Sequence, residues 1–224
     1  MSTPSDARRH APATERNREP ILAVLQRVLP PAGTVLEISS GTGEHAVYFA
    51  PRLAPRQWLP SDPDPGARAS IAAWREVNPA ANLHAPLPLD AAAPLWPVES
   101  ENFRDLCRDS LAGPDLQQHP ITALVNINMI HIAPWAACLG LLAGAGRILP
   151  PGGILYLYGP YRQNGQHTAP SNAAFDASLQ GQNPDWGVRD LDAVVATAKV
   201  HNLALVETIA MPANNLSVVF RAIA

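Results

Sequence analysis

The sequence has 224 residues, 47% of them hydrophobic, and carries a formal net charge of −3 at pH 7. This length supports one substantial hydrophobic core and is too short for two comfortable domains. The acidic balance and the scattered basic residues, with Lys199 as the only lysine, argue against nucleic-acid binding by phosphate neutralisation.

Other features of the sequence bear on localisation and on domain organisation. No apolar run reaches the roughly 20 residues that a membrane-spanning helix needs, and the N-terminus lacks the apolar region of a secretory signal. Cys107 and Cys138 lie far apart without CxxC spacing, which fits a reducing cytosol and predicts no metal site. We therefore expect a cytoplasmic protein with no membrane partner. Residues 1–15 are polar and predict a mobile arm, and residues 16–224 predict a single domain.

Apolar spacing, prolines and glycines predict the elements in chain order. Helices are expected at Ile21–Leu29, Glu44–Ala50, Pro65–Val77, Asn102–Leu111, Pro134–Ala145 and Arg189–Asn202. Strands are expected at Thr34–Ile38, Gln57–Asp62, Leu83–Asp90, 121–130, Ile154–Tyr158, 203–211 and 215–223. The third strand is expected to be a ragged edge because Pro86 and Pro88 lack an N–H group. The polar segment Arg162–Asn172 is expected to be a loop.

Strands that alternate with helices indicate a parallel α/β sheet. The last two strands are joined by the short segment PANN, so they must be antiparallel, because a parallel pair needs a long crossover. Seven strands with a terminal hairpin and helices on both faces are the layout of the Rossmann-like class I S-adenosylmethionine (SAM) methyltransferases.

The stretch VLEISSGTGEHAVYFA, residues 35–50, is a strand that enters a glycine turn and then a helix. Gly41 to Ala46 fits the dinucleotide pattern G-x-G-x-x-A, whereas Glu37, Ser39, Gly41 and Gly43 together resemble the methyltransferase turn. In both cases the backbone approaches a ligand closely, and the helix start favours a carboxylate or phosphate. A tight strand–helix connection without a ligand is the simpler alternative.

Two acids follow the next two predicted strands. Asp62 lies about twenty residues after the turn, where an acid accepts hydrogen bonds from ribose hydroxyls, although it could equally cap the helix that starts near Pro65. Asp90 closes the third strand, where methyltransferases place an acid near the adenine amino group, but an aspartate at the start of a loop is also ordinary.

The fourth predicted strand ends in unusual polar residues. NINMIHIAPW places Asn126, Asn128 and His131 at the carboxyl end of a central strand, where ligands bind in open α/β sheets. Polar side chains in an apolar strand cost free energy unless they are paired, so buried and hydrogen-bonded asparagines are the alternative.

Several motifs together resemble the methyltransferase-like 26 family, a group of uncharacterised, class I SAM-binding proteins. The resemblance covers residue 14 to the C-terminus and is carried by ERNREPIL, LEISSGTGEHAVYFA, NMIHIAPW, YGPY, SNAAFDASL, WGVRDL and MPANNL. It implies the SAM-methyltransferase fold but supplies no substrate.

The resemblance also implies roles for individual residues. The methionyl part of SAM would be held by Glu37, Ser39, Gly41 and Gly43, the ribose by Asp62, and Asn128 or its carbonyl would face the SAM ammonium group. Asp90 would lie near the adenine. Residues outside the cofactor set would form the acceptor site, namely Arg16, Asn17, Tyr158, Tyr161, Ser171 and Asn172.

Methyl transfer asks the protein mainly to align the two reactants and to exclude water. His131 is the candidate general base because its ordinary pKa suits that role, and Tyr158 is the second candidate catalytic residue; either could instead be structural. The sequence thus predicts SAM-dependent methylation of a small molecule. A non-catalytic SAM sensor or scaffold remains open. An NAD-dependent oxidoreductase is disfavoured because Lys199 has Val195, not tyrosine, four residues before it.

Overall fold

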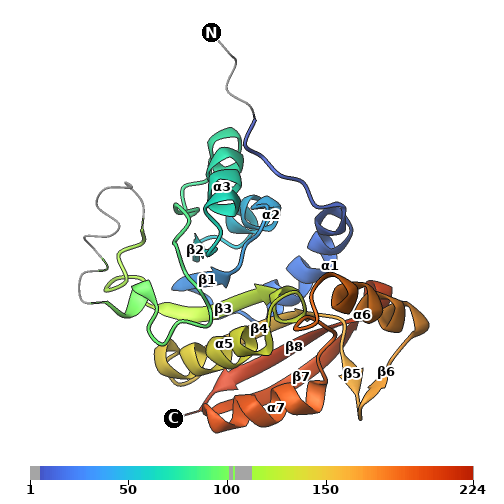
Figure 1. Ribbon diagram of the computed structural model, residues 1–224. Helices are drawn as coiled ribbons and strands as arrows, with labels where there is room; N and C mark the ends of the chain where they lie inside the picture. The colour runs from blue at the N-terminus through green and yellow to red at the C-terminus, as the bar shows by residue number, and fades with distance from the viewer. Residues whose placement is uncertain (1–5, 101–102, 104–112, 224) are drawn as a thin grey trace.

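The computed structural model describes residues 6–100, 103 and 113–223, and it contains one six-stranded sheet in the order β2-β1-β3-β4-β8-β7 (Figure 1). The strands of this sheet are β1 (Thr34–Ile38), β2 (Gln57–Pro60), β3 (Ile121–Ile127), β4 (Ile154–Gly159), β7 (Leu203–Met211) and β8 (Asn215–Ala222). The α-helices are α1 (Pro12–Val28), α2 (Glu44–Arg52), α3 (Pro65–Val77), α5 (Trp135–Ile148), α6 (Pro170–Gln182) and α7 (Leu191–Val200). Short 3-10 helices are η1 (Pro97–Glu99), η2 (Met129–His131) and η3 (Pro212–Asn214).

The strand pairing matches the predicted topology of the chain ends. β1 pairs in parallel with β2 and β3, and β3 pairs in parallel with β4. β8 is antiparallel to both β4 and β7, so the predicted antiparallel terminal hairpin is confirmed. Its antiparallel course brings the start of β8 beside the end of β4, where Leu216 faces Gly159.

The predicted strand Leu83–Asp90 is not formed. Leu83 and Leu87 make isolated bridges to Trp58 and Ser61 beside β2, and no longer ladder joins them. Pro86 and Pro88 remove the N–H groups that a continuous ladder would need. The sheet among the described residues therefore has six strands rather than seven.

The first helix begins earlier than its apolar residues predict. α1 starts at Pro12, whereas the expected helix started at Ile21 and the expected mobile arm ran to residue 15. The added turns bury Thr14 and Asn17, which are polar and give no apolar periodicity. Pro20 lies inside α1, where it removes one helical hydrogen bond and obscures the helix in the sequence.

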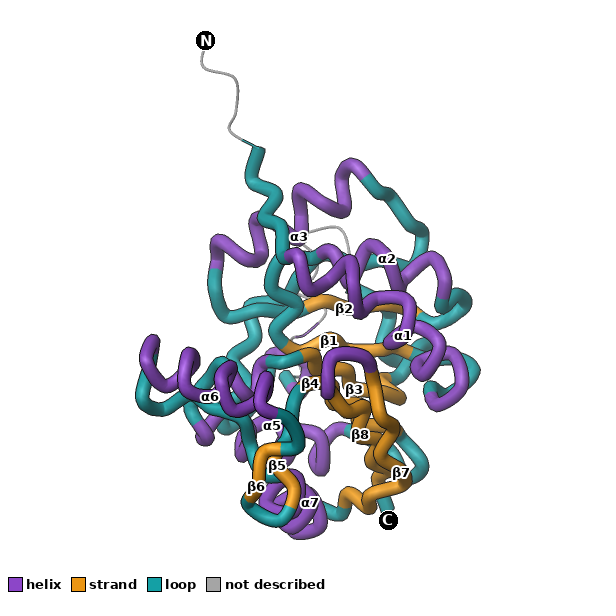
Figure 2. The backbone as a smooth tube through the Cα atoms, turned by 90° about the vertical axis from the view of Figure 1, so that its right-hand side faces the viewer, coloured by secondary structure: helices purple, strands orange, loops and turns teal. Residues whose placement is uncertain are grey.

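The segment expected as a loop, Arg162–Asn172, instead contains a small hairpin and the start of α6. The hairpin is formed by β5 (Arg162–Gln163) and β6 (Gln166–His167). Both the hairpin and α6 lie beside the main sheet rather than in it (Figure 2). The predicted helix Asn102–Leu111 lies, except for Phe103, outside the described residues.

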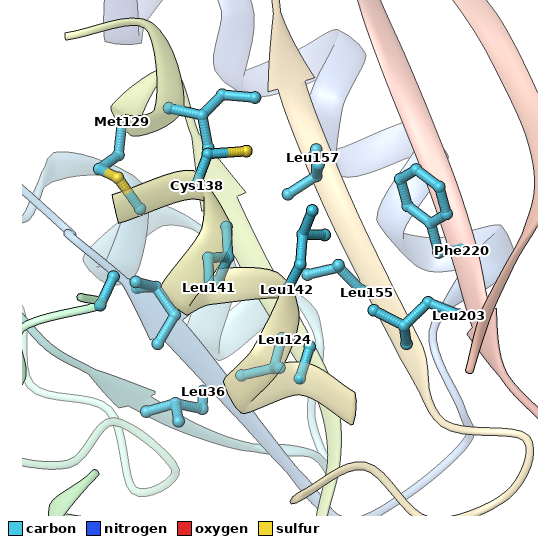
Figure 3. Packing of buried hydrophobic residues seen from close by; sticks show 14 of the residues in the cluster. Leu36, Leu124, Met129, Cys138, Leu141, Leu142, Leu155, Leu157, Leu203 and Phe220 are labelled. Carbon is cyan, nitrogen blue, oxygen red and sulfur yellow. The ribbon is translucent and has the colours of Figure 1, made fainter. Parts of the chain in front are cut away.

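Two hydrophobic clusters cover the two faces of the sheet. α5 and α7 pack on one face, where Leu141 and Leu142 of α5 lie against Leu155 and Leu157 of β4 (Figure 3). α1 and α2 pack on the other face around residues such as Phe49 and Trp58. Within the described part of the chain, no helix combines the length and apolarity needed to cross a membrane.

Candidate functional site

Three adjoining cavities lie along the carboxyl ends of β1, β3 and β4. A cavity of about 300 Å³ contains Asp90 and Met129 and shares Ser39 with a second cavity of about 260 Å³. The second cavity in turn shares Asn17 and Asn128 with a third of about 410 Å³. The first is the Asp90 cavity, the second the Gly41 cavity and the third, which five asparagines line, the Asn cavity. This edge is where ligands bind in open α/β sheets.

The glycine turn between β1 and α2 has the backbone that its sequence predicts. Gly41 and Gly43 have φ values of +59° and +90°, and Ser39 also has a positive φ of 56°. A Cβ atom on Gly41 would meet no atom within 4 Å, whereas one on Gly43 would lie 2.7 Å from the Cα of Ile71 on α3. Gly43 therefore serves close packing of helices, and Gly41 leaves open space in the cavity that it lines.

Glu37 is a buried carboxyl group at the floor of the Gly41 cavity. Its side chain is 2% exposed, and its Oε2 accepts a hydrogen bond of 3.0 Å from Trp58 Nε1. Burial raises the pKa of Glu37 to about 7, and the nearby Asp62 adds to this effect. No cationic side chain pairs with Glu37 among the residues that the structure describes, and an opposite charge brought close to it would favour its ionised form.

Asp62 fixes the glycine turn from the end of β2. Its Oδ2 accepts from Gly41 N at 3.0 Å, its Oδ1 accepts from Asp64 N at 3.0 Å, and burial raises its pKa. Asp64, not Asp62, caps α3, because it accepts from the backbone of Gly66 and Ala67. The alternative that Asp62 is the helix cap is therefore wrong. Asp62 is absent from the linings of the three cavities, whereas the exposed Asp90 lines its own.

The N-terminal segment crosses over the glycine turn. Arg9 N donates to Ser70 Oγ at 2.8 Å, Ala11 N donates to Glu44 Oε2 at 2.7 Å, and the Arg9 carbonyl accepts from Trp74 Nε1 at 3.0 Å. Ala11, together with Ala13 and Thr14 of α1, lines the Gly41 cavity. This crossing and the start of α1 therefore form one wall of the cavity, as Figure 1 shows for the path from α3 to α1.

The Asn cavity is built around the hydroxyl group of Tyr158 on β4. Asn215 Nδ2 donates to this hydroxyl at 3.0 Å, and Asn17 of α1 approaches the same oxygen as a second donor. Asn17 Oδ1 in turn lies 2.8 Å from His45 Nε2. Burial lowers the pKa of His45 to about 4, so His45 is neutral at pH 7 and can donate its N–H to Asn17. Both Asn17 and Tyr158 belong to the predicted site.

The predicted Ser171 and Asn172 also line the Asn cavity, where α6 meets the turn before β8. Asn172 Nδ2 donates to the Asn214 carbonyl at 2.9 Å, and Asn214 Nδ2 donates to Ser171 Oγ at 3.0 Å. Ala213 and Asn214 both have left-handed backbones, with φ values of 57° and 59°.

Several polar residues that line the cavities were not singled out as site residues from the sequence, among them Asn214, Asn215 and His45. The motif MPANN contains the first two. It forms a turn with left-handed residues that are not glycine, and strained turns of this kind cluster at functional sites.

Besides Asp62, four predicted residues lie outside the cavity linings: Gly43, Arg16, Tyr161 and His131. Arg16 is exposed on α1, and the Tyr161 side chain is fully buried in the core against the ring of His131. His131 is also fully buried. Gly159 packs directly against its ring, since a Cβ atom on Gly159 would lie only 2.5 Å from His131 Nε2. Burial lowers the pKa of His131 to about 3, so the imidazole is a weak base. Base catalysis by His131 stays a prediction, and this placement argues against it.

Arg189, in the motif WGVRDL, joins several of the other motifs. Its guanidinium group donates to the carbonyl groups of Ile130 at 2.8 Å and Ala133 at 2.6 Å, and its backbone N donates to His131 Nδ1 at 3.3 Å. Asp176 of α6 accepts from Val188 N at 2.7 Å in the same motif. These contacts hold α6 relative to η2, and α6 contributes Ser171, Asn172 and Phe175 to the Asn cavity. Over the described ranges, no group of three or more His, Cys, Asp or Glu residues could hold a metal ion.

The sequence matches the model of one protein family. The sequence model of a family described as a protein of unknown function, DUF938, matches residues 8–222.

Comparison with solved structures gives methyltransferases. An O-methyltransferase family protein from Burkholderia thailandensis is 12% identical with a TM-score of 0.71 over 95% of this chain and 58% of that chain. The SAM-dependent methyltransferase SibL, in its apo form, is 16% identical with a TM-score of 0.70 over 95% of this chain and 56% of that chain. Human N-acetylserotonin methyltransferase in complex with SAM is 12% identical with a TM-score of 0.69, over 95% of this chain and 53% of that chain.

These likenesses confirm the predicted fold class. The chain has the α/β fold of the class I SAM methyltransferases, with a sheet of six strands among its described residues instead of the seven expected. It spans little more than half the length of these structural relatives.

Proposed function

The chain belongs to the DUF938 family, and from the geometry of its cleft we propose that it is a SAM-dependent methyltransferase that acts on a small molecule. The observation that carries this proposal is the Gly41 cavity. The buried acid Glu37 and an open glycine backbone face the same space there, and this space adjoins a second cavity with an acid at its edge.

The residues that line the Gly41 and Asp90 cavities have the chemistry that the two ends of SAM need. Glu37 would pair with the ammonium group, and the backbone of Ser39, Gly41 and Gly43 would lie against the methionyl part. Asp90 would lie near the adenine. Asp62 would contact the ribose, since each of its oxygens keeps a second lone pair beyond the backbone bond that it accepts. Asn128 lines both the Gly41 and the Asn cavities, so it would lie where cofactor and acceptor meet.

When bound, SAM would supply a methyl group that an acceptor lone pair takes as the carbon–sulfur bond breaks, with S-adenosylhomocysteine as the leaving group and the acceptor's proton passing to solvent. The protein itself would contribute by positioning the acceptor relative to the cofactor. Tyr158, Asn17, Ser171 and Asn172 would hold the acceptor in the Asn cavity, with Tyr158 as a residue that touches it. With SAM bound, the cofactor and the α1 wall would together exclude water around Glu37, which would strengthen the electrostatic interactions there.

We propose supporting roles for the remaining predicted residues. His131 and Tyr161 would support the backbone of Gly159 from the core side. The exposed Arg16 would contact an acceptor only at the solvent-facing edge of the Asn cavity. We also propose that the chain is a member of the methyltransferase-like 26 group. The support is that YGPY, SNAAFDASL and MPANNL, three of the motifs that carry the resemblance, supply eight of the residues that line the Asn cavity. For partners we propose a small-molecule acceptor, no nucleic acid and no membrane, in the cytoplasm.

Isothermal titration calorimetry of the purified chain with SAM, S-adenosylhomocysteine and NAD tests the cofactor. We expect saturable binding of the first two and none of NAD. Binding of NAD without SAM would overturn the proposal in favour of an oxidoreductase.

A panel of small acceptors with labelled SAM then tests transfer, and metabolite profiling of a deletion strain should reveal a compound lighter by one methyl group. Tight SAM binding without transfer to any acceptor, and without such a compound, would favour the SAM sensor or scaffold.

A further inference from the structure

The Asn cavity has an unusual lining. Five of its eleven residues are asparagines, and none is Asp, Glu, Lys, Arg or His. The lining consists of Ala13, Asn17, Asn128, Tyr158, Pro160, Ser171, Asn172, Phe175, Ala213, Asn214 and Asn215. Polar groups thus come from carboxamides and two hydroxyls, and apolar area comes from Phe175, Pro160 and two alanines.

A cavity with this lining discriminates by charge. A carboxylate, phosphate or ammonium group placed in it would lose its hydration and find no opposite charge among the lining residues, which costs several kcal/mol. A carboxamide, by contrast, both donates and accepts hydrogen bonds, so it satisfies an uncharged molecule that does the same. The acidic residue Glu37 lines the neighbouring Gly41 cavity and is not part of the lining of the Asn cavity.

The hydroxyl group of Tyr158 has a defined direction. Asn215 Nδ2 divides its two hydrogens between this hydroxyl, at 3.0 Å, and the Pro212 carbonyl, at 3.1 Å. Asn17 approaches as a second donor because its Oδ1 faces His45 Nε2, which leaves its NH₂ group for Tyr158. The oxygen of Tyr158 therefore accepts, and its own hydrogen has no acceptor in the part of the chain that the structure describes. That hydrogen is available to a ligand.

The turn that carries Asn215 is strained and clamped. Two successive non-glycine residues, Ala213 and Asn214, adopt the left-handed conformation, which is unfavourable for alanine and better tolerated by asparagine. The hydrogen bonds from α6, through Ser171 and Asn172, hold the turn in this state. A strained turn persists only when surrounding contacts hold it, so the position of Asn215 is fixed before any ligand binds.

Building on the proposed methyltransferase function, we propose that the Asn cavity accepts an uncharged small molecule that donates and accepts hydrogen bonds, and that Tyr158 O–H donates to an oxygen or nitrogen atom of that molecule. Carboxylates, phosphates and ammonium compounds are rejected. Asn17 and Asn215 are positioning residues that act through Tyr158.

Three probes of similar size and different charge test this proposal: 4-fluorophenol, 4-fluorobenzoate and 4-fluorobenzylammonium. Their binding is followed by fluorine NMR at pH 7, with and without S-adenosylhomocysteine. We expect the phenol to bind at least about tenfold more tightly than either ion, a difference of about 1.4 kcal/mol. Tyr158→Phe should weaken phenol binding about fivefold to tenfold, the effect of one net hydrogen bond, and leave S-adenosylhomocysteine affinity unchanged.

A charge placed in the lining gives the matched control. Ser171→Asp keeps an acceptor for Asn214 and should shift the preference toward the benzylammonium probe. Ser178→Asp adds the same charge to the same helix at an exposed position outside the lining, and should change nothing.

Equal binding of an ionic probe and the phenol, unchanged phenol binding in Tyr158→Phe, or no saturable binding of any probe would each overturn the proposal. Failure of the proposed function looks different, since S-adenosylhomocysteine would then not bind while the order of the three probes could still hold.

Discussion

Replacing Glu37 by glutamine separates the stability of the fold from its ligand binding. The change keeps the shape of the side chain and an oxygen acceptor for Trp58 Nε1, but removes the ionisable group. Burial raises the pKa of Glu37 from 4.5 to about 7. A shift of about 2.5 pKa units corresponds to about 3 kcal/mol between the protonated and ionised forms. Because this side chain is fully buried, solvent screening does not reduce that figure much.

The sign of the effect follows from the raised pKa. Between about pH 4.5 and pH 7 the folded state holds a proton on Glu37 that the unfolded state has lost. The stabilisation is complete below pH 4.5, falls as the pH rises through this window, and is gone above pH 7. In Glu37→Gln this loss is absent. We therefore expect the wild type to lose about 2–3 kcal/mol more than the variant in free energy of unfolding between pH 5 and pH 8.

Urea unfolding of both proteins at pH 5, 6, 7 and 8 measures this difference, with the slope of each transition used to check two-state behaviour. Glu76→Gln, at an exposed position of α3, controls for the loss of one negative charge. Parallel pH curves for wild type and Glu37→Gln would refute the reasoning. At pH 8 the variant should also bind S-adenosylhomocysteine about 10- to 100-fold more weakly, because a hydrogen bond to a charged group contributes about 1.5–3 kcal/mol. Unchanged affinity would remove the ammonium role of Glu37.

Three further substitutions test the placement of the cleft. Gly41→Val should abolish SAM binding because its side chain enters the cavity, and should lower the melting temperature without unfolding the protein because a β-branched residue is strained at a φ of +59°; normal binding by a folded variant would mean that the pocket lies elsewhere. Gly43→Ala should also lower the melting temperature, since its Cβ would lie 2.7 Å from the Ile71 backbone, and an unchanged temperature would contradict this geometry. His131→Ala should cost about 2–4 kcal/mol of stability, as for other large-to-small core changes, with SAM affinity retained; wild-type stability with a selective loss of turnover would return His131 to the role of base.

The regular elements of the sheet were predictable because their physics is local. Thr34–Ile38 and Ile154–Tyr158 are short apolar runs bounded by glycine or proline, and they form strands in the structure. Leu83–Asp90 has the same apolar character, but its prolines cannot complete a ladder, so only two bridges form. The first half of α1 was missed because it buries Thr14 and Asn17 for their hydrogen bonds and packing at the cleft, and no apolar periodicity records that role.

The cofactor side of the site was more predictable than the acceptor side. Glu37, Gly41 and Gly43 are close in sequence, and their spacing reflects a single turn. The Asn cavity is assembled from α1, β4, α6 and the turn before β8, so no local pattern shows that Asn17 and Asn215 meet at Tyr158. The polarity of His131 suggested catalysis from the sequence, whereas Gly159 and Arg189 enclose it.

The N-terminal crossing over the glycine turn makes ligand exchange a matter of kinetics as well as affinity. Its backbone bonds to Ser70 of α3 and Glu44 of α2 can break locally without disturbing the sheet, because both acceptors lie on helices and neither belongs to a strand. Whatever occupies the Gly41 cavity leaves at a rate that this opening controls, while Glu37 and the glycine turn set how strongly it is held. Residence time and binding strength are thus encoded in different residues of one short stretch of chain, and each can change without the other.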